Sequence, residues 1–328
     1  MAFKAPLPGS ILLGKYRVER VLGEGGMGVV VEATHLELDQ SVAIKLLGRH
    51  EGREEEMLAR FRNEAQIAAR LPAEHIVHAI DAGRTEDGDA YLVMELLPGR
   101  DLDQELDARG RLPIKEAVDY VLQACEGVAE AHAVGLVHRD LKPANLFLTR
   151  SRRGAPIVKV LDFGIATCLP GARLPSITSE GELFGTPVYM APEQFDSGGE
   201  VDARCDQRAL ATVLFELCAG TPPFFDEHPG RLARQVATEA PPRLSSQLPS
   251  LPRALDAAVA KAMALRPAER FADLAAFARA IAPFGSQPEA REAADRIAFV
   301  LGTGPASAKR RRPRRLGRAL AATVAVGL

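Results

Sequence analysis

Side chains that suit phosphate and metal binding are concentrated in one short stretch, residues 138–145 (HRDLKPAN). This stretch holds an acid, Asp140, a cation, Lys142, and an amide, Asn145; a second acid, Asp162, begins an Asp-Phe-Gly sequence seventeen residues after the amide. Hard oxygen ligands hold Mg²⁺, a carboxylate orients a hydroxyl group, and a lysine meets phosphate charge. The chain is therefore expected to bring these groups together, across one short strand-turn-strand, in a phosphoryl-transfer site.

The two blocks resemble the catalytic loop (His-Arg-Asp-Leu-x-x-x-Asn) and the metal-binding loop (Asp-Phe-Gly) of protein kinases. The resemblance implies that Asp140 accepts or orients the proton of the substrate hydroxyl and that Lys142 neutralises charge on the transferred phosphoryl group. It implies that Asn145 and Asp162 bind Mg²⁺, with Mn²⁺ as the alternative ion. It also implies that His138 supports the loop through hydrogen bonds.

A glycine-rich segment near the N-terminus lies between two stretches that alternate as strands do, residues 16–22 and 29–33. Glycines there let backbone N–H groups approach phosphate oxygens, although a plain hairpin has the same pattern. A dinucleotide-binding fold needs a helix after the glycines, whereas a valine-rich strand follows here, which favours the kinase interpretation. The resemblance implies nucleotide contacts from Leu22, Gly23, Glu24, Gly25, Gly26, Met27, Gly28, Val29 and Val30.

Residues 42–45 (VAIK) match the kinase tetrad that carries the phosphate-binding lysine. Lys45 by itself reads as a solvent-facing strand lysine, but the resemblance implies that it meets the α- and β-phosphates of ATP, with Ala43 beside the nucleotide. Its acidic partner is expected on a helix over residues 54–71. Glu64 is the best-placed acid, because the glutamates at the helix start are expected there as partners of the helix dipole.

Residues 91–97, followed by Pro98-Gly99, indicate a buried strand that ends in a turn. By resemblance this is the hinge between two lobes, where Met94 gates the pocket behind adenine and the backbones of Glu95 and Leu97 hydrogen-bond the base. Residues 112–135 are expected to form a long amphipathic helix that leads to the catalytic loop.

Two features resemble serine/threonine kinases: the Lys-Pro pair inside the catalytic loop, and residues 185–193 (GTPVYMAPE), which match the family segment that docks peptide substrates. The resemblance further implies an ion pair between Glu193 and Arg270. An apolar helix over residues 209–219, with Asp206 at its start, is expected to form the core of the larger lobe.

The loop between Asp162 and Glu193 carries hydroxyl side chains. Arg139 directly precedes the catalytic acid, and an arginine there can pair with a phosphate on this loop and order it. We expect autophosphorylation at Thr178 or Ser179, which requires self-association if it occurs in trans.

Charge is distributed unevenly along the chain. The net charge is −2, but residues 309–318 (KRRRPRRLGR) carry seven positive charges and no acid. The apolar run 319–328 that follows is about half the length that spans a bilayer. We expect the basic block to attract anionic lipid, with a solvated linker as the alternative and no nucleic-acid partner. The apolar run fits either the start of a membrane helix that anchors the chain or an ordinary apolar tail. The sequence shows no signal peptide, and its four cysteines are widely spaced, which indicates a cytoplasmic catalytic domain.

These features together predict an α+β protein-kinase fold with two lobes: a small antiparallel sheet with one helix, over a mainly helical lobe. We expect a leader at 1–15, the N-terminal lobe at 16–97, the C-terminal lobe at 98–282, a linker at 283–308, and the basic block with its apolar tail at 309–328. The predicted function is ATP-dependent phosphorylation of serine or threonine in proteins, in signalling, by a bacterial relative of eukaryotic-type kinases.

Two other functions compete with this prediction. A pseudokinase that only binds nucleotide or a partner would be recognised by the loss of Lys45, Asp140 or Asp162, and all three are present. A small-molecule phosphotransferase of the same fold would not need the complete peptide-docking segment 185–193.

Overall fold

The computed structural model describes residues 5–25, 28–47, 73–85, 88–151, 153–162, 187–196 and 201–303 of the 328-residue chain. Several sequence predictions lie outside the described residues. They concern Gly26, Met27, Glu64, Thr178, Ser179 and the basic block 309–318.

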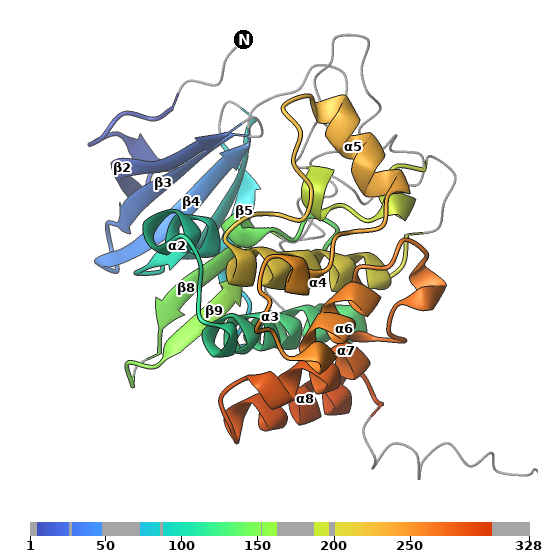
Figure 1. The fold of residues 1–328 in the computed structure, drawn as a ribbon. Helices are drawn as coiled ribbons and strands as arrows, with labels where there is room; N and C mark the ends of the chain where they lie inside the picture. Colours follow the sequence, from blue (N-terminus) through green and yellow to red (C-terminus); the bar gives the residue numbers. More distant parts are fainter. Residues whose placement is uncertain are drawn as a thin grey trace, which may run out of the picture.

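The N-terminal lobe is a single antiparallel sheet with the strand order β1-β2-β3-β4-β6-β5 (Figure 1). Its strands are β1 (Ile11–Leu12), β2 (Tyr16–Gly25), β3 (Gly28–His35), β4 (Gln40–Leu47), β5 (Ala79–Arg84) and β6 (Ala90–Glu95). Alternate residues of a strand point to opposite faces, and each face of this sheet has its own apolar cluster. β1 lies inside the predicted leader and pairs with β2, so the lobe begins before residue 16.

A second, smaller sheet lies beneath the first and belongs to the C-terminal lobe. It consists of β7 (Arg100–Asp101), β8 (Leu146–Arg150) and β9 (Pro156–Val160), in that order. A parallel bridge joins Ile76 to Val160, and the Val77 N–H donates to the Val160 carbonyl over 3.1 Å. The segment that leads into β5 is thereby attached to the C-terminal lobe.

The rest of the C-terminal lobe is helical, and α4 runs through its centre (Figure 1). Nearly every residue of α4 is buried, as expected of a helix at the centre of a lobe. The buried set includes the polar side chains of Asp206, Gln207, Arg208, Thr212 and Glu216. The helices are α2 (Leu102–Arg109), α3 (Ile114–Ala133), α4 (Arg204–Ala219), α5 (Pro229–Thr238), α6 (Arg253–Ala262), α7 (Leu274–Ile281) and α8 (Glu289–Val300). Short 3-10 turns include η1 (Pro143–Asn145), η2 (Pro187–Tyr189) and η3 (Pro192–Gln194). The predicted α+β fold with two lobes is confirmed.

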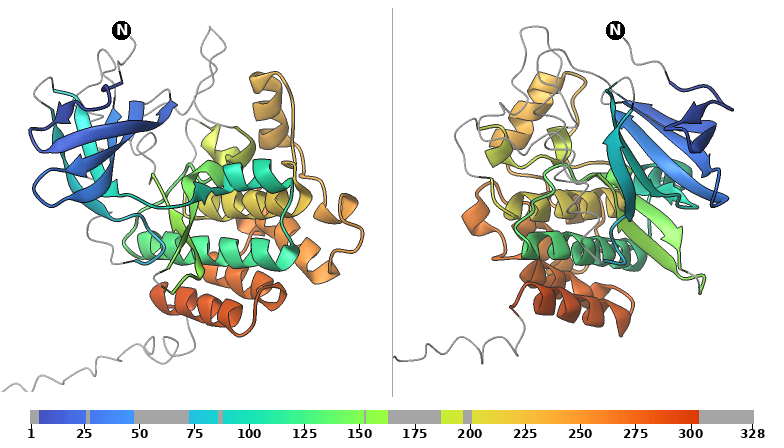
Figure 2. Two further views of the ribbon diagram at one scale, coloured as in Figure 1. Left: turned by 90° about the vertical axis from the view of Figure 1, so that its left-hand side faces the viewer. Right: turned by 180° about the vertical axis from the view of Figure 1, so that it is seen from behind.

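The predicted linker at 283–308 is wrong over most of its length, because α8 packs against α3 and α7 (Figure 2). The Ser286 N–H donates to Asp119 on α3 over 2.7 Å, and Arg296 donates to both carboxylate oxygens of Glu126 over 2.6 and 2.9 Å. The alanine-rich composition suggested a linker, yet alanine is the best helix former and its small side chain lets helices approach closely. The buried stripe of α8 is Ala290, Ala293, Ala294, Ile297 and Ala298.

The described cysteines, Cys125, Cys205 and Cys218, are buried free thiols. Burial raises the pKa of Cys218 to about 12. Within the described ranges, no helix combines the length and the apolar content that crossing a membrane requires.

Candidate active site

The β8–β9 hairpin brings the two predicted metal ligands together. Asn145 directly precedes β8 and Asp162 comes two residues after β9, and the strands pair with Leu146 opposite Val160. The Leu161 N–H donates to the Asn145 carbonyl over 2.9 Å. Antiparallel pairing places the start of one strand beside the end of the other, so an amide and a carboxylate distant in sequence become neighbours. Carboxylate and amide oxygens suit Mg²⁺, and this pair therefore fits the metal that the sequence predicts.

Asp140 and Lys142 lie beside this pair in the catalytic loop. Lys142 Nζ is 3.4 Å from Asp140 Oδ2, and the side-chain amide of Asn145 donates to the Asp140 carbonyl over 2.6 Å and to Oδ2 over 3.2 Å. The Asp140 side chain is still 37% exposed. Its carboxylate is thus held in place by two neighbours and remains accessible to a substrate hydroxyl, as a general base must be.

Lys45 connects the upper sheet to the metal-binding loop. Its side chain is largely buried on β4, and Nζ lies 2.7 Å from Asp162 Oδ2. A lysine is rarely buried without an anionic partner, and Asp162 supplies one across the two lobes. The sequence predicts Glu64 as the partner of Lys45, and Glu64 lies outside the described residues; the pairing with Asp162 was not predicted. Sequence spacing contains no signal for it, because more than a hundred residues separate the two.

The predicted base-binding residues gather on one face of the upper sheet. Ala43 and Met94 belong to one apolar cluster, with Val30 and Leu97 packed against it. The Val29 side chain lies in the cluster on the opposite face, so Val30 rather than Val29 directs its side chain to this side. Strand alternation explains the difference, since adjacent residues cannot both face the nucleotide.

The two residues predicted to bind the base through their backbone differ in their hydrogen bonds. The Glu95 N–H donates to the His78 carbonyl over 3.0 Å, and the Glu95 carboxylate accepts from Lys159 over 2.8 Å. Leu97 lies just beyond β6, and its backbone N–H and C=O make no hydrogen bond with another residue in the described part of the chain. A position that binds the edge of a base needs such unpaired backbone groups.

The glycine-rich hairpin has the predicted strand–loop–strand form, with Gly25 opposite Gly28. Gly28 has a φ of +147°, and an added Cβ would lie 1.9 Å from the Leu46 carbonyl oxygen. Only glycine fits such a close approach between strands. Gly28 therefore lets β3 lie close to β4, the strand that carries Lys45.

Asp206, at the start of α4, supports the catalytic loop from below. Its carboxylate accepts from the backbone N–H of His138 over 2.8 Å and of Arg139 over 2.7 Å, and lies 2.8 Å from the His132 ring. Burial by itself would raise the pKa of Asp206, but these hydrogen bonds together lower it. Arg139 has a φ of +67°, a strained conformation that the bonds to Asp206 help to maintain.

The supporting roles of Asp206 and His132 were missed by the sequence analysis. The available signal was a carboxylate placed just before the apolar run 209–219. The predicted support from His138 is present, because its Nε2 lies 2.9 Å from the Leu161 carbonyl oxygen. That contact joins the catalytic loop to the residue before Asp162.

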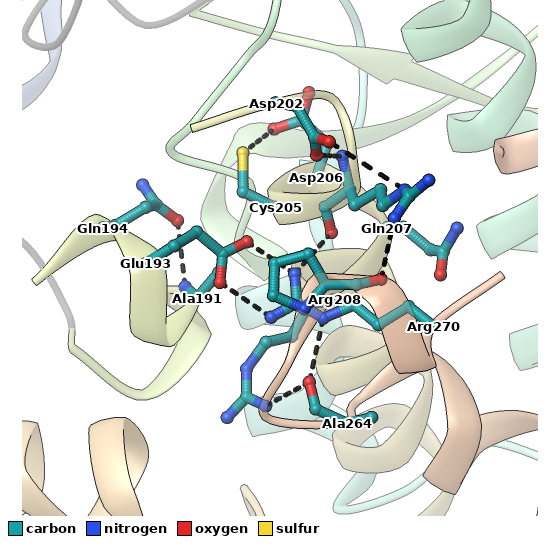
Figure 3. A network of polar contacts seen from close by, with 12 residues as sticks. Ala191, Glu193, Gln194, Asp202, Cys205, Asp206, Gln207, Arg208, Ala264 and Arg270 are labelled. Carbon is teal, nitrogen blue, oxygen red and sulfur yellow. Dashed lines mark hydrogen bonds and ion pairs between the residues drawn. The ribbon is translucent and has the colours of Figure 1, made fainter. Parts of the chain in front are cut away.

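The predicted ion pair between Glu193 and Arg270 is confirmed, and Figure 3 shows it between η3 and the segment that follows α6. It is bidentate, at 2.6 and 2.7 Å, and the Arg270 guanidinium also donates to the carbonyls of Arg204, Ala264 and Leu265. Tyr189, in the same peptide-docking segment, donates to Glu216 of α4 over 2.6 Å. The segment is thus attached to the helical core at two points.

His75 and His78, a pair with metal-ligand spacing, have structural contacts instead. His75 Nδ1 lies 2.9 Å from the Val158 carbonyl oxygen, and the His78 backbone N–H donates to Glu95 over 2.9 Å. Among the described residues, no three His, Cys, Asp or Glu side chains converge on a common metal position. Asn145 and Asp162 therefore remain the predicted metal ligands.

Comparisons with known proteins identify the family. Residues 16–275 match the family model described as a protein kinase domain. The chain is 41% identical over 278 residues to the serine/threonine-protein kinase Pkn1 of Myxococcus xanthus, covering 84% of this chain and 39% of the relative. It is 38% identical over 284 residues to PknH of Mycobacterium tuberculosis, covering 87% of this chain and 44% of PknH. The chain thus spans less than half the length of these two relatives.

Solved structures agree with the assignment. The kinase domain of Mycobacterium tuberculosis PknI is 34% identical, with a TM-score of 0.65, over 86% of this chain and all (100%) of that domain. A double mutant of the same domain gives a TM-score of 0.69 at 32% identity, over 86% of this chain and 99% of that one. Both the sequence match and the fold place the site described above in one family: the chain belongs to the protein kinases and contains a protein kinase domain of the bacterial serine/threonine type.

Proposed function

We propose that this chain transfers the γ-phosphoryl group of Mg-ATP to serine or threonine hydroxyls of proteins, in signalling. One observation carries the proposal: the 2.7 Å ion pair between Lys45 and Asp162 joins the upper sheet to the metal-binding loop, and His138 links that loop to the catalytic loop that holds Asp140. A nucleotide held by the upper sheet would have its phosphates between these groups. The serine/threonine preference is supported by the names of the relatives.

The proposed roles follow from position and chemistry. Asn145 and Asp162 would hold Mg²⁺, with Mn²⁺ as the alternative ion, and the bound metal supplies charge neutralisation at the phosphates. Asp140 takes or orients the proton of the attacking hydroxyl, and Lys142 meets the charge on the transferred group. Lys45 positions the phosphates, because its ammonium group is fixed by β4 and by Asp162.

The first test is phosphate transfer from labelled ATP with Mg²⁺, comparing the wild-type chain with Asp140→Asn. A generic basic protein serves as substrate, and autophosphorylation is followed in parallel. We expect label on serine or threonine in the wild type and a loss of about 10²-fold or more in the variant. Asp295→Asn, an exposed acid on α8, is the matched control and should keep full activity. Nucleotide-dependent thermal stabilisation without transfer in either protein would instead indicate a pseudokinase.

We further propose activation by autophosphorylation at Thr178 or Ser179, through self-association of two chains. Arg139, beside the catalytic acid, supports this, because an arginine at that position can pair with a phosphate. Mapping of phosphorylated residues in active enzyme should find one of the two modified. Active enzyme without phosphate at either residue would remove the proposal.

The basic block 309–318 is proposed to bind anionic membrane surfaces while the catalytic domain remains in the cytoplasm. The support is its seven positive charges next to an apolar run. The intact chain should co-sediment with vesicles that contain phosphatidylserine, whereas a protein of residues 1–308 should stay in the supernatant. Equal sedimentation of the two proteins would rule out this role.

A further inference from the structure

Arg208 is a buried cation in the middle of the C-terminal lobe. It lies on α4 two residues after Asp206, its side chain is 1% exposed, and it is among the largest fully buried side chains. Within the described residues it forms no ion pair with an acid, and its Nε has no hydrogen-bond partner. Burying a charge is costly unless other groups compensate it. A residue of this kind needs a structural or functional reason to be present.

The compensation comes from the carboxyl ends of two helices. Arg208 Nη2 donates to the Val236 carbonyl, in the last turn of α5, over 3.3 Å. Nη1 donates to the carbonyls of Met263 and Ala264, the two residues that follow α6. The last carbonyls of a helix lack partners within it and carry partial negative charge, so they suit a guanidinium. Burial lowers the pKa of Arg208 to about 10, and the side chain remains protonated at neutral pH.

Arg208 shares this network with the ion pair behind the peptide-docking segment. The Ala264 carbonyl accepts from Arg208 over 3.4 Å and from Arg270 over 2.9 Å. Figure 3 shows both guanidinium groups beside this carbonyl, with Glu193 on the opposite side. The two arginines therefore fix α4, η3 and the residues after α6 relative to one another.

The bond to Val236 adds α5 to this network; among the described residues, α5 otherwise packs mainly against η2 and η3. Its buried residues are Ala233 and Val236. The Val236 side chain belongs to a small apolar cluster with Val188 and Phe224 that is separate from the main core. Figure 1 shows α5 on the opposite side of α4 from α8. Val236 is thus held to α4 through its backbone, while its side chain holds residue Val188 of η2.

We propose that Arg208 is a positioning residue for protein substrates. It holds α5 in place, and the apolar cluster around Val236 in turn holds residues 187–196, where a protein substrate docks. The inference rests on the proposed kinase function. Arg208 is too deeply buried to touch a substrate, so it acts through these two segments. The groups assigned to the nucleotide, such as Lys45 and Met94, lie on the upper sheet and are independent of it.

The test separates the KM for protein substrate from the KM for ATP. Arg208→Met keeps a long side chain but removes the bonds to Val236, Met263 and Ala264. Replacing a buried charge by an apolar group of similar size is commonly tolerated, so the variant should fold. Loss of charge-assisted hydrogen bonds should raise the KM for a generic basic protein about tenfold, while the KM for ATP changes less than about twofold.

Two companion variants make the result specific. Arg208→Lys retains the charge and part of the hydrogen bonding and should restore much of the affinity for protein substrate. Arg279→Met makes the same substitution at an exposed position on α7 and should behave as the wild type. Hydrogen exchange gives an independent measure, because the α5 amides (residues 230–238) should exchange faster in Arg208→Met than in either companion.

An unchanged KM for protein substrate, an equal rise in both KM values, or unchanged exchange in α5 would each overturn the role of Arg208. If Arg208→Met does not fold, Arg208→Gln, which also removes the positive charge, takes its place under the same criteria. Absence of phosphate transfer in the wild type would instead refute the proposed function, and the exchange measurement would still decide whether Arg208 holds α5.

Discussion

At the scale of single residues, the catalytic loop depends most directly on Asp206. Its buried carboxylate binds two backbone N–H groups of the loop and the ring of His132. Asp206→Ala would leave these donors unpaired, and we expect a loss of about 3–5 kcal/mol in the free energy of unfolding. Activity should fall as well, because the loop loses its support. Urea unfolding at pH 7 measures the change, and Asp295→Ala, at an exposed position, is the control. A loss below about 1 kcal/mol would contradict this role.

The same residue predicts a pH dependence. The hydrogen bonds lower the pKa of Asp206 below its unfolded value of about 3.9. A lowered acid pKa stabilises the fold at pH values above the unfolded pKa, and the contribution is lost as pH falls through the folded pKa. The stability difference between wild type and Asp206→Ala should therefore stay constant from pH 7 to about 5 and narrow only below about 4. Narrowing already between pH 7 and 5 would contradict a lowered pKa for Asp206.

At the scale of secondary structure, α8 is a part of the domain that the family model does not include. Ile297 is fully buried against the core, whereas Phe299 on the same helix is 80% exposed. Ile297→Ala should cost about 2–4 kcal/mol of unfolding free energy, because it leaves a cavity, and Phe299→Ala should cost almost nothing. Thermal unfolding of the two variants compares them directly. Similar small effects would show that α8 adds little stability.

At the scale of the whole molecule, the contact between Lys45 and Asp162 suggests that nucleotide and metal bind across both lobes. Mg-ATP at about one hundred times its Kd should stabilise the fold by about 2.7 kcal/mol, seen as a higher Tm. In Asp162→Asn, adding Mg²⁺ to ATP should give no further rise in Tm over ATP alone. In Asp295→Asn, the further rise should remain. Equal Mg²⁺ effects in the two variants would exclude Asp162 as a metal ligand.

Much of the fold followed from sequence because its determinants are local. Strand alternation around the glycines predicted the β2–β3 hairpin, and helical periodicity predicted α3. The order of the motifs then implied two lobes. Sequence reasoning failed for α8, where an alanine-rich stripe gave a weak apolar signal, and for Val29, where it did not separate the two faces of the strand.

The sequence by itself therefore determined which chemical groups are present and in what order: the lysine, the two acids, the amide and the Glu193–Arg270 pair. Tertiary structure alone decided which of them meet. Asp162 joins Lys45, Asp206 supports a loop some 67 residues earlier, and Arg208 finds its partners at the ends of α5 and α6. Such contacts join residues far apart in the chain, and they depend on how helices and sheets pack, which no local pattern records.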